Sequence, residues 1–75
     1  MKELLTYIAN SLVSKPEEIL VSELTTESAT TLKLKVAGED MGRIIGRGGR
    51  TAKEIRTIIR AANRDKGKVM VDFVD

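Results

Sequence analysis

Four consecutive residues, Gly46-Arg47-Gly48-Gly49, combine a permissive backbone with a positive charge, which suits the binding of a phosphate group. Glycine has no Cβ atom, so another backbone can approach closely and positive φ angles are allowed. Arg47 lies at the tip of this segment and Arg50 follows it, and both guanidinium groups can reach phosphate oxygens. A helix that begins near Arg50 adds unpartnered amide groups and the positive end of its dipole. The segment therefore predicts a clamp for a phosphate backbone, with a simple turn between two helices as the alternative.

Basic residues are concentrated in one part of the sequence. The whole chain of 75 residues has a net charge of +2. The stretch from Met41 to Arg64 has seven basic side chains and one acid, Glu54, which gives +6 and leaves −4 for the other residues. This distribution favours a polyanion as the ligand, and the alternative is a solvated helix face that is rich in arginine. The basic side chains are Arg43, Arg47, Arg50, Lys53, Arg56, Arg60 and Arg64.

The residue types exclude most catalytic and metal chemistry. The chain has no cysteine and no histidine, so a disulfide, a thiolate metal site and an imidazole base cannot be built. A dinucleotide-binding fingerprint that starts at Gly46 needs glycine where the chain has Thr51. A phosphate-binding P-loop that starts at Gly42 needs glycine where the chain has Arg47. We therefore expect no enzyme activity, no metal, no cofactor and no small-molecule substrate.

The size of the chain predicts one domain, residues 1–75. A domain of this length buries only ~60% of the surface that its unfolded chain exposes, so a partner or a second copy is an expected source of stability. The sequence has no apolar run of the ~20 residues needed to span a bilayer. Its first residues lack the apolar stretch of a signal peptide. We expect a cytoplasmic protein without a membrane span.

Hydrophobic spacing predicts elements in the order α-β-β-α-α-β. Leu4, Leu5, Ile8 and Ala9 form a helical stripe, and Pro16 follows the end of that helix. The expected helices cover 3–13, 41–45 and 50–62, the expected strands cover 19–25, 31–37 and 68–74, and turns cover 14–18, 26–29 and 65–67. Either Glu39 or Asp40 is expected near the beginning of the second helix.

Alternation within the strands predicts how the sheet faces the core. Leu32, Leu34 and Val36 share one face, and Lys33 and Lys35 share the other. The connection through two helices to the last strand is long, and such crossovers join parallel strands. We expect an α+β fold in which a three-stranded mixed sheet has strand 31–37 at its centre and three helices on one face. The expected inward residues of the last strand and helix are Val69, Val71, Phe73, Ala52, Ile55, Ile58, Ile59 and Ala62, with Arg56 at the border.

The stretch Ile44-Ile45-Gly46-Arg47-Gly48-Gly49-Arg50-Thr51-Ala52-Lys53-Glu54-Ile55 resembles the signature of the KH domain, with its GXXG loop between two helices. The order of elements is similar to the type II, prokaryotic arrangement. The resemblance covers essentially the whole chain. It is greatest to the short bacterial single-KH RNA-binding proteins of the KhpA kind, in which a motif like Gly49-Arg50-Thr51-Ala52-Lys53 follows the start of the loop.

This resemblance implies a groove for about four single-stranded nucleotides. The glycine loop and its two helices form one side of such a groove, and the sheet edge forms the other. Ile44 and Ile55 are expected in the core rather than in contact with RNA, and Ala52 is expected to support the groove floor. The implied RNA-binding residues are Arg43, Ile45, Gly46, Arg47, Gly48, Gly49, Arg50, Thr51 and Lys53.

The implied function is binding of single-stranded RNA with low sequence specificity, as a post-transcriptional regulator or RNA chaperone. The two aromatic residues, Tyr7 and Phe73, are too few for a binding mode that depends on stacking platforms. The resemblance also implies a homodimer, or a heterodimer with a Jag-type KH protein. The face around Thr57, Arg60 and Ala61 is the expected interface. The alternative is an adaptor that uses the KH fold for dimerisation or partner binding without RNA.

Overall fold

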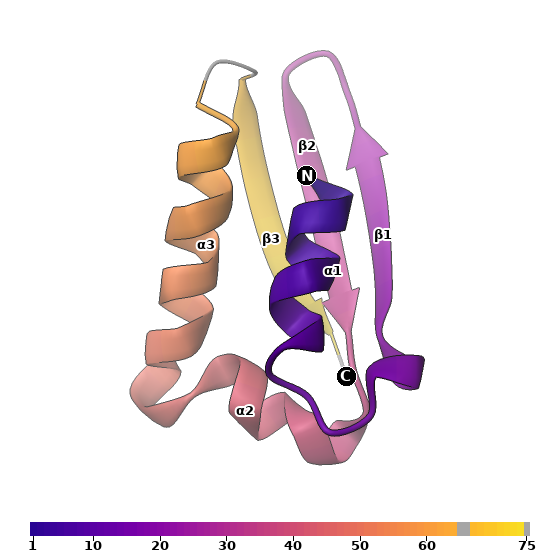
Figure 1. The fold of residues 1–75 in the computed structure, drawn as a ribbon. Coiled ribbons are helices and arrows are strands. Elements are labelled where there is room, and N and C mark those ends of the chain that lie inside the picture. The colour runs from indigo at the N-terminus through magenta and orange to yellow at the C-terminus, as the bar shows by residue number, and fades with distance from the viewer. Residues whose placement is uncertain (65–66, 75) are drawn as a thin grey trace.

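The computed structural model describes residues 1–64 and 67–74, which are drawn as a ribbon in Figure 1. The predicted order α-β-β-α-α-β is confirmed. The helices are α1 (Lys2–Asn10), α2 (Met41–Ile45) and α3 (Arg50–Ala62), and the strands are β1 (Leu20–Thr25), β2 (Ala29–Lys35) and β3 (Lys68–Val74). Single 3-10 turns cover Pro16–Glu18, Gly38–Asp40 and Arg47–Gly49.

The bounds of α2, α3 and β3 agree with those predicted, and the three other elements differ. Strand β1 begins one residue later than expected, and helix α1 begins one residue earlier. Helix α1 ends three residues early, where the Ser11 hydroxyl donates a hydrogen bond to the carbonyl of Ile8 at 2.7 Å and competes with the helical pattern. Strand β2 begins and ends two residues earlier than expected. Val36 still faces the core with 3% exposure, although the chain has already left the sheet. The predicted turn at 65–67 lies partly outside the described residues.

The sheet has the predicted topology, with β2 between β1 and β3. Strands β1 and β2 are antiparallel, with Val21 opposite Leu34. Strands β2 and β3 are parallel, with Leu32 beside Val71. The crossover through α2 and α3 therefore does join parallel strands, and it leaves β3 at one edge of the sheet.

The core lies between one face of the sheet and the helices, and α1 and α3 lie side by side over that face (Figure 1). The prediction that Ile58 and Ala62 of α3 face the core is wrong, because Ile58 is 47% exposed and Ala62 is exposed. Ile58 is turned about 100° around the helix from the buried Ile59, which points it outward. The buried apolar residues are Leu5, Ala9, Val21, Leu32, Leu34, Val36, Ala37, Ile44, Ala52, Ile55, Ile59, Val69 and Val71.

The other face of the sheet is open. Lys33 and Lys35 are exposed on it, as the alternation predicts, with Leu20 and Leu24 also exposed beside them. Within residues 1–64 and 67–74, no helix combines the length and the apolar character needed to cross a membrane.

Candidate nucleic-acid interface

The glycine loop joins α2 to α3 by a tight turn. The amide of Gly46 donates to the carbonyl of Gly42 at 2.9 Å, which ends α2. The amide of Gly49 donates to the carbonyl of Gly46 at 3.1 Å, which closes the turn. Gly46, Gly48 and Gly49 have φ angles of 76°, 65° and 81°, so three of the four loop residues lie where side chains are rarely tolerated. Arg47 is the one loop residue with a negative φ, and its side chain is exposed.

Gly46 and Gly48 are required for different reasons. A Cβ atom at Gly46 would lie 2.7 Å from the Cβ and 2.9 Å from the backbone nitrogen of Thr51, so this position has no room for a side chain. A Cβ atom at Gly48 would meet no atom within 4 Å. Gly46 therefore packs the loop onto α3, while Gly48 leaves an open backbone surface that a ligand can approach.

The electrostatics of the junction favour an anion. Arg47, Arg50 and Lys53 are exposed, and none of them forms a salt bridge with another described residue. Helix α3 has no side-chain cap at its N-terminus, where Gly49 stands in a left-handed conformation. Amide donors at a helix N-terminus and the positive end of the dipole attract phosphate oxygens. The glycine loop, the exposed cations and the N-terminus of α3 therefore all favour an anion at the α2–α3 junction.

The residues predicted for RNA binding lie at the α2–α3 junction or on the two helices beside it. Gly46–Gly49 and Arg50 gather at the α2–α3 junction. Thr51 and Ile45 are half-buried at the same junction, where Thr51 packs against Gly46. Arg43 and Lys53 lie farther from the loop tip, and the Arg43 guanidinium is 3.7 Å from the carboxylate of Asp40.

The supporting residues of the junction are placed as predicted. Ile44 and Ile55 are 0% and 2% exposed, which confirms them as core residues, and Ala52 is 4% exposed in the first turn of α3. Because α2 and the first turn of α3 are both anchored in the core in this way, the loop between them is held on a rigid base.

Asp40 is a buried carboxylate that the sequence interpretation missed, since we expected only a helix-capping role there. Its side chain is 1% exposed and makes no capping hydrogen bond to α2. It accepts hydrogen bonds from the amide and hydroxyl of Ser14, at 3.0 and 2.8 Å, and from the amide of Lys15 at 3.1 Å. The hydrogen bond from the Ser14 amide holds the pKa of Asp40 below its usual value. No local sequence motif predicts this contact, because Ser14 and Lys15 lie 26 and 25 residues before Asp40 in the chain.

Arg56 is a second residue that the sequence interpretation left out of the site. It is half-buried, and its Nε–H donates to the carbonyl of Val71 at 3.2 Å. Its guanidinium carbon lies 4.9 Å from the centre of the Phe73 ring. The signal in the sequence was its position at the border between the apolar stripe and the polar face of α3. Arg56 therefore joins α3 to the edge strand β3.

A glycine loop between two helices, mounted on a mixed sheet in the order α-β-β-α-α-β, defines the chain as a type II KH domain. The family model described as KhpA/KhpB, KH domain, matches residues 2–73, and the chain belongs to this family.

Curated relatives agree with this membership. The chain is 52% identical over 75 residues to RNA-binding protein KhpA of Clostridium acetobutylicum, which covers 99% of this chain and 100% of the relative. It is 43% identical over 76 residues to RNA-binding protein KhpA of Chlamydia trachomatis, with 100% of this chain and 97% of the relative covered. It is also 38% identical over 76 residues to RNA-binding protein KhpA of Listeria monocytogenes, with both chains fully covered.

Proposed function

We propose that this protein binds short single-stranded RNA in the cytoplasm, through a single KH domain and without catalysis. One observation carries the proposal: the open backbone at Gly48 lies between the exposed Arg47 and the uncapped N-terminus of α3. The function in the names of the relatives, RNA binding, supports the same conclusion.

The proposed RNA lies with its phosphates at the loop and its bases along α3 and the edge of β3. About four nucleotides fit such a groove. Few phosphates and few bases are then in contact, so one domain binds weakly and with low sequence specificity. A role as a post-transcriptional regulator or RNA chaperone follows from binding of this kind.

The test of the clamp is a double variant, Arg47→Asp with Gly48→Asp. Both side chains point into open surface, and aspartate is among the residues that best tolerate the φ of 65° at position 48. We expect the fold to remain, by circular dichroism, and the affinity for a fluorescent single-stranded RNA octamer to fall at least about tenfold, as for loss of a charge-assisted contact.

The matched control places the same change of three charge units on α1, as Lys2→Asp with Asn10→Asp, where both residues are exposed. The control has the same net charge as the loop variant. It therefore separates the effect of the loop position from the effect of the net charge of the protein. If both double variants lose affinity equally, or neither loses any, the loop is not the clamp.

Salt dependence gives an independent measure of the contact. With two to four phosphates neutralised, the slope of log K against log salt is expected to be roughly −1.5 to −3 for a single strand. The Arg47→Asp, Gly48→Asp variant should have a shallower slope, whereas the α1 control should keep the native one. A slope near zero in the native protein would argue for an adaptor that does not hold RNA.

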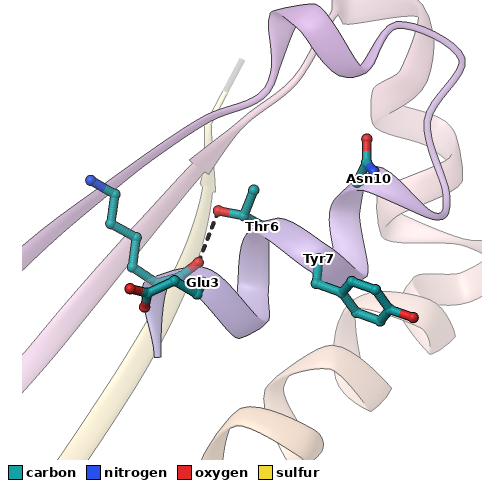
Figure 2. A pocket seen from close by; sticks show the side chains of 5 residues that line it. Glu3, Thr6, Tyr7 and Asn10 are labelled. Atoms are coloured by element: carbon teal, nitrogen blue, oxygen red, sulfur yellow. Dashed lines mark hydrogen bonds between the residues drawn. The ribbon is translucent and has the colours of Figure 1, made fainter.

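We further propose that the outer face of α3 contacts a second KH domain, from another copy of this chain or from a Jag-type protein. Thr57, Arg60 and Ala61 are exposed there, next to the 47% exposed Ile58. On the neighbouring helix α1, Tyr7 is 74% exposed, and it lines a surface hollow together with Glu3, Thr6 and Asn10 (Figure 2). Two linked grooves raise the affinity for RNA by increasing the effective concentration.

Light scattering tests this interface. We expect Ile58→Glu to convert a dimer into a monomer and to weaken binding of a long RNA more than binding of an octamer. The control is Ser28→Glu, which adds the same charge at the exposed connection between β1 and β2. A dimer that survives Ile58→Glu would place the interface elsewhere.

A further inference from the structure

Arg56 differs from the other arginines of the basic stretch. Those at positions 43, 47, 50, 60 and 64 are exposed, whereas Arg56 is half-buried between α3 and β3. It has no carboxylate partner among the described residues. A half-buried cation without an acid is costly unless other groups stabilise it, so its surroundings show what this side chain is placed to do.

Two contacts fix the plane of the Arg56 guanidinium. Its Nε–H donates to the carbonyl of Val71 at 3.2 Å, and its carbon lies 4.9 Å from the centre of the Phe73 ring. Strand β3 is at the edge of the sheet. The hydrogen bond to Val71 and the contact with the Phe73 ring together remove the rotational freedom that an arginine normally has at a surface.

The far end of the same guanidinium is open to solvent. Nε makes the one hydrogen bond of this side chain within the described residues. No buried side-chain nitrogen or oxygen in these residues lacks a partner. The two terminal Nη atoms are therefore accessible, and they present parallel N–H donors in a fixed plane beside β3.

A fixed pair of parallel donors recognises a pair of adjacent acceptors. Guanine has such a pair at O6 and N7, which is the usual bidentate partner of arginine. Cytosine has one at O2 and N3. In adenine the amino group stands next to N1 and N7, and in uracil N3–H separates O2 from O4, so neither base offers two adjacent acceptors. The distinction depends on base chemistry and not on base size.

We propose that Arg56 is a specificity-determining residue that selects guanine or cytosine at one position of the bound strand. This inference rests on the proposed function, since it requires RNA in the groove between the loop and β3. It gives the low-specificity groove one preferred position, which is set by the Val71 carbonyl and the Phe73 ring behind Arg56.

The experiment compares octamers of cytidine, uridine and adenosine in fluorescence anisotropy. Cytosine and uracil have the same ring size, so their comparison isolates the acceptor pattern. We expect the native protein to bind the cytidine octamer about tenfold more tightly than the other two. Arg56→Lys keeps the positive charge but loses the pair of parallel N–H donors, so it should bind all three octamers within twofold of one another.

A second variant keeps the test decisive if Arg56→Lys does not fold. Phe73→Leu leaves Arg56 in place but removes the ring that holds its plane, and it should reduce the cytidine preference to about threefold. A native protein without a cytidine preference, or a preference that survives both changes, overturns the proposal. A native protein that binds none of the octamers, with no effect of Arg47→Asp and Gly48→Asp, overturns the proposed function instead.

Discussion

Helix α2 is held at its two ends by different means. At its beginning, the buried carboxylate of Asp40 accepts three hydrogen bonds from Ser14 and Lys15, which precede β1 in the chain. At its end, Gly46 turns the backbone at a positive φ that side chains rarely tolerate, and the space around Gly48 is open. One end is fixed from the interior, and the other presents its backbone to solvent.

The difference separates stability from ligand contact within a few residues. The Asp40 anchor ties α2 to the segment that follows α1, so it connects two distant parts of the chain. The glycine loop makes few contacts of its own and depends on the buried Ile44 and Ile55 for its base. Changes at the anchor should therefore act on folding, and changes at the loop tip should act on binding.

Gly46→Ala should give the largest loss of stability, because Gly46 belongs to the packed side of the loop. Its φ of 76° and ψ of 173° are essentially restricted to glycine, and an added Cβ would collide with Thr51. We expect the free energy of unfolding in urea to fall by about 3 kcal/mol. Gly48→Ala is the control, with a similar φ but open space, and should cost only about 1 kcal/mol. Equal losses would mean that the Thr51 contact is unimportant.

Asp40→Asn should have the next largest effect. Asparagine keeps the shape but replaces one acceptor oxygen with an NH2 group, which would face an amide donor of Ser14 or Lys15. We expect the melting temperature to fall by roughly 5–10 °C.

Glu39→Gln is the matched control for this change, since the neighbouring carboxylate is 61% exposed and only pairs with Lys15 at 3.0 Å. Loss of such an exposed pair should shift the melting temperature by less than about 2 °C. If the two variants melt alike, the interior anchor contributes no more than the surface pair.

The fold was largely predictable because its signals are local and periodic. The alternation of Leu32 and Leu34 with lysines predicted the inner face of β2, and a long crossover predicted the parallel pairing with β3. The glycine loop was also predictable, since its four residues are consecutive and the helices on both sides have clear patterns.

The anchor and the Arg56 contact were not predictable in this way. Asp40 finds its donors about 25 residues earlier in the chain, and Arg56 finds its carbonyl 15 residues later. Such pairs depend on the three-dimensional packing, and single sequence positions do not encode it. The same holds for Ile58. The helical stripe predicted that it faces inward, but the contact of α3 with the sheet is narrower than this stripe and leaves Ile58 exposed.

The pH dependence of stability gives the smallest and most specific test of the anchor. The hydrogen bond from the Ser14 amide lowers the pKa of Asp40 in the folded protein, so the native state favours the carboxylate. The stabilisation is fully present above the unfolded pKa of about 3.9 and is lost as the pH falls through the lower pKa of the folded state. A protonated Asp40 has one donor and one acceptor, like asparagine.

The difference in melting temperature between the native protein and Asp40→Asn should therefore be constant from pH 7 to about pH 5 and shrink below about pH 4. Differential scanning fluorimetry across this range measures it, and the subtraction removes the contribution of the other carboxylates common to both proteins. A difference that stays constant to pH 2 would show that the anchor depends on the shape of the Asp40 side chain and not on its charge.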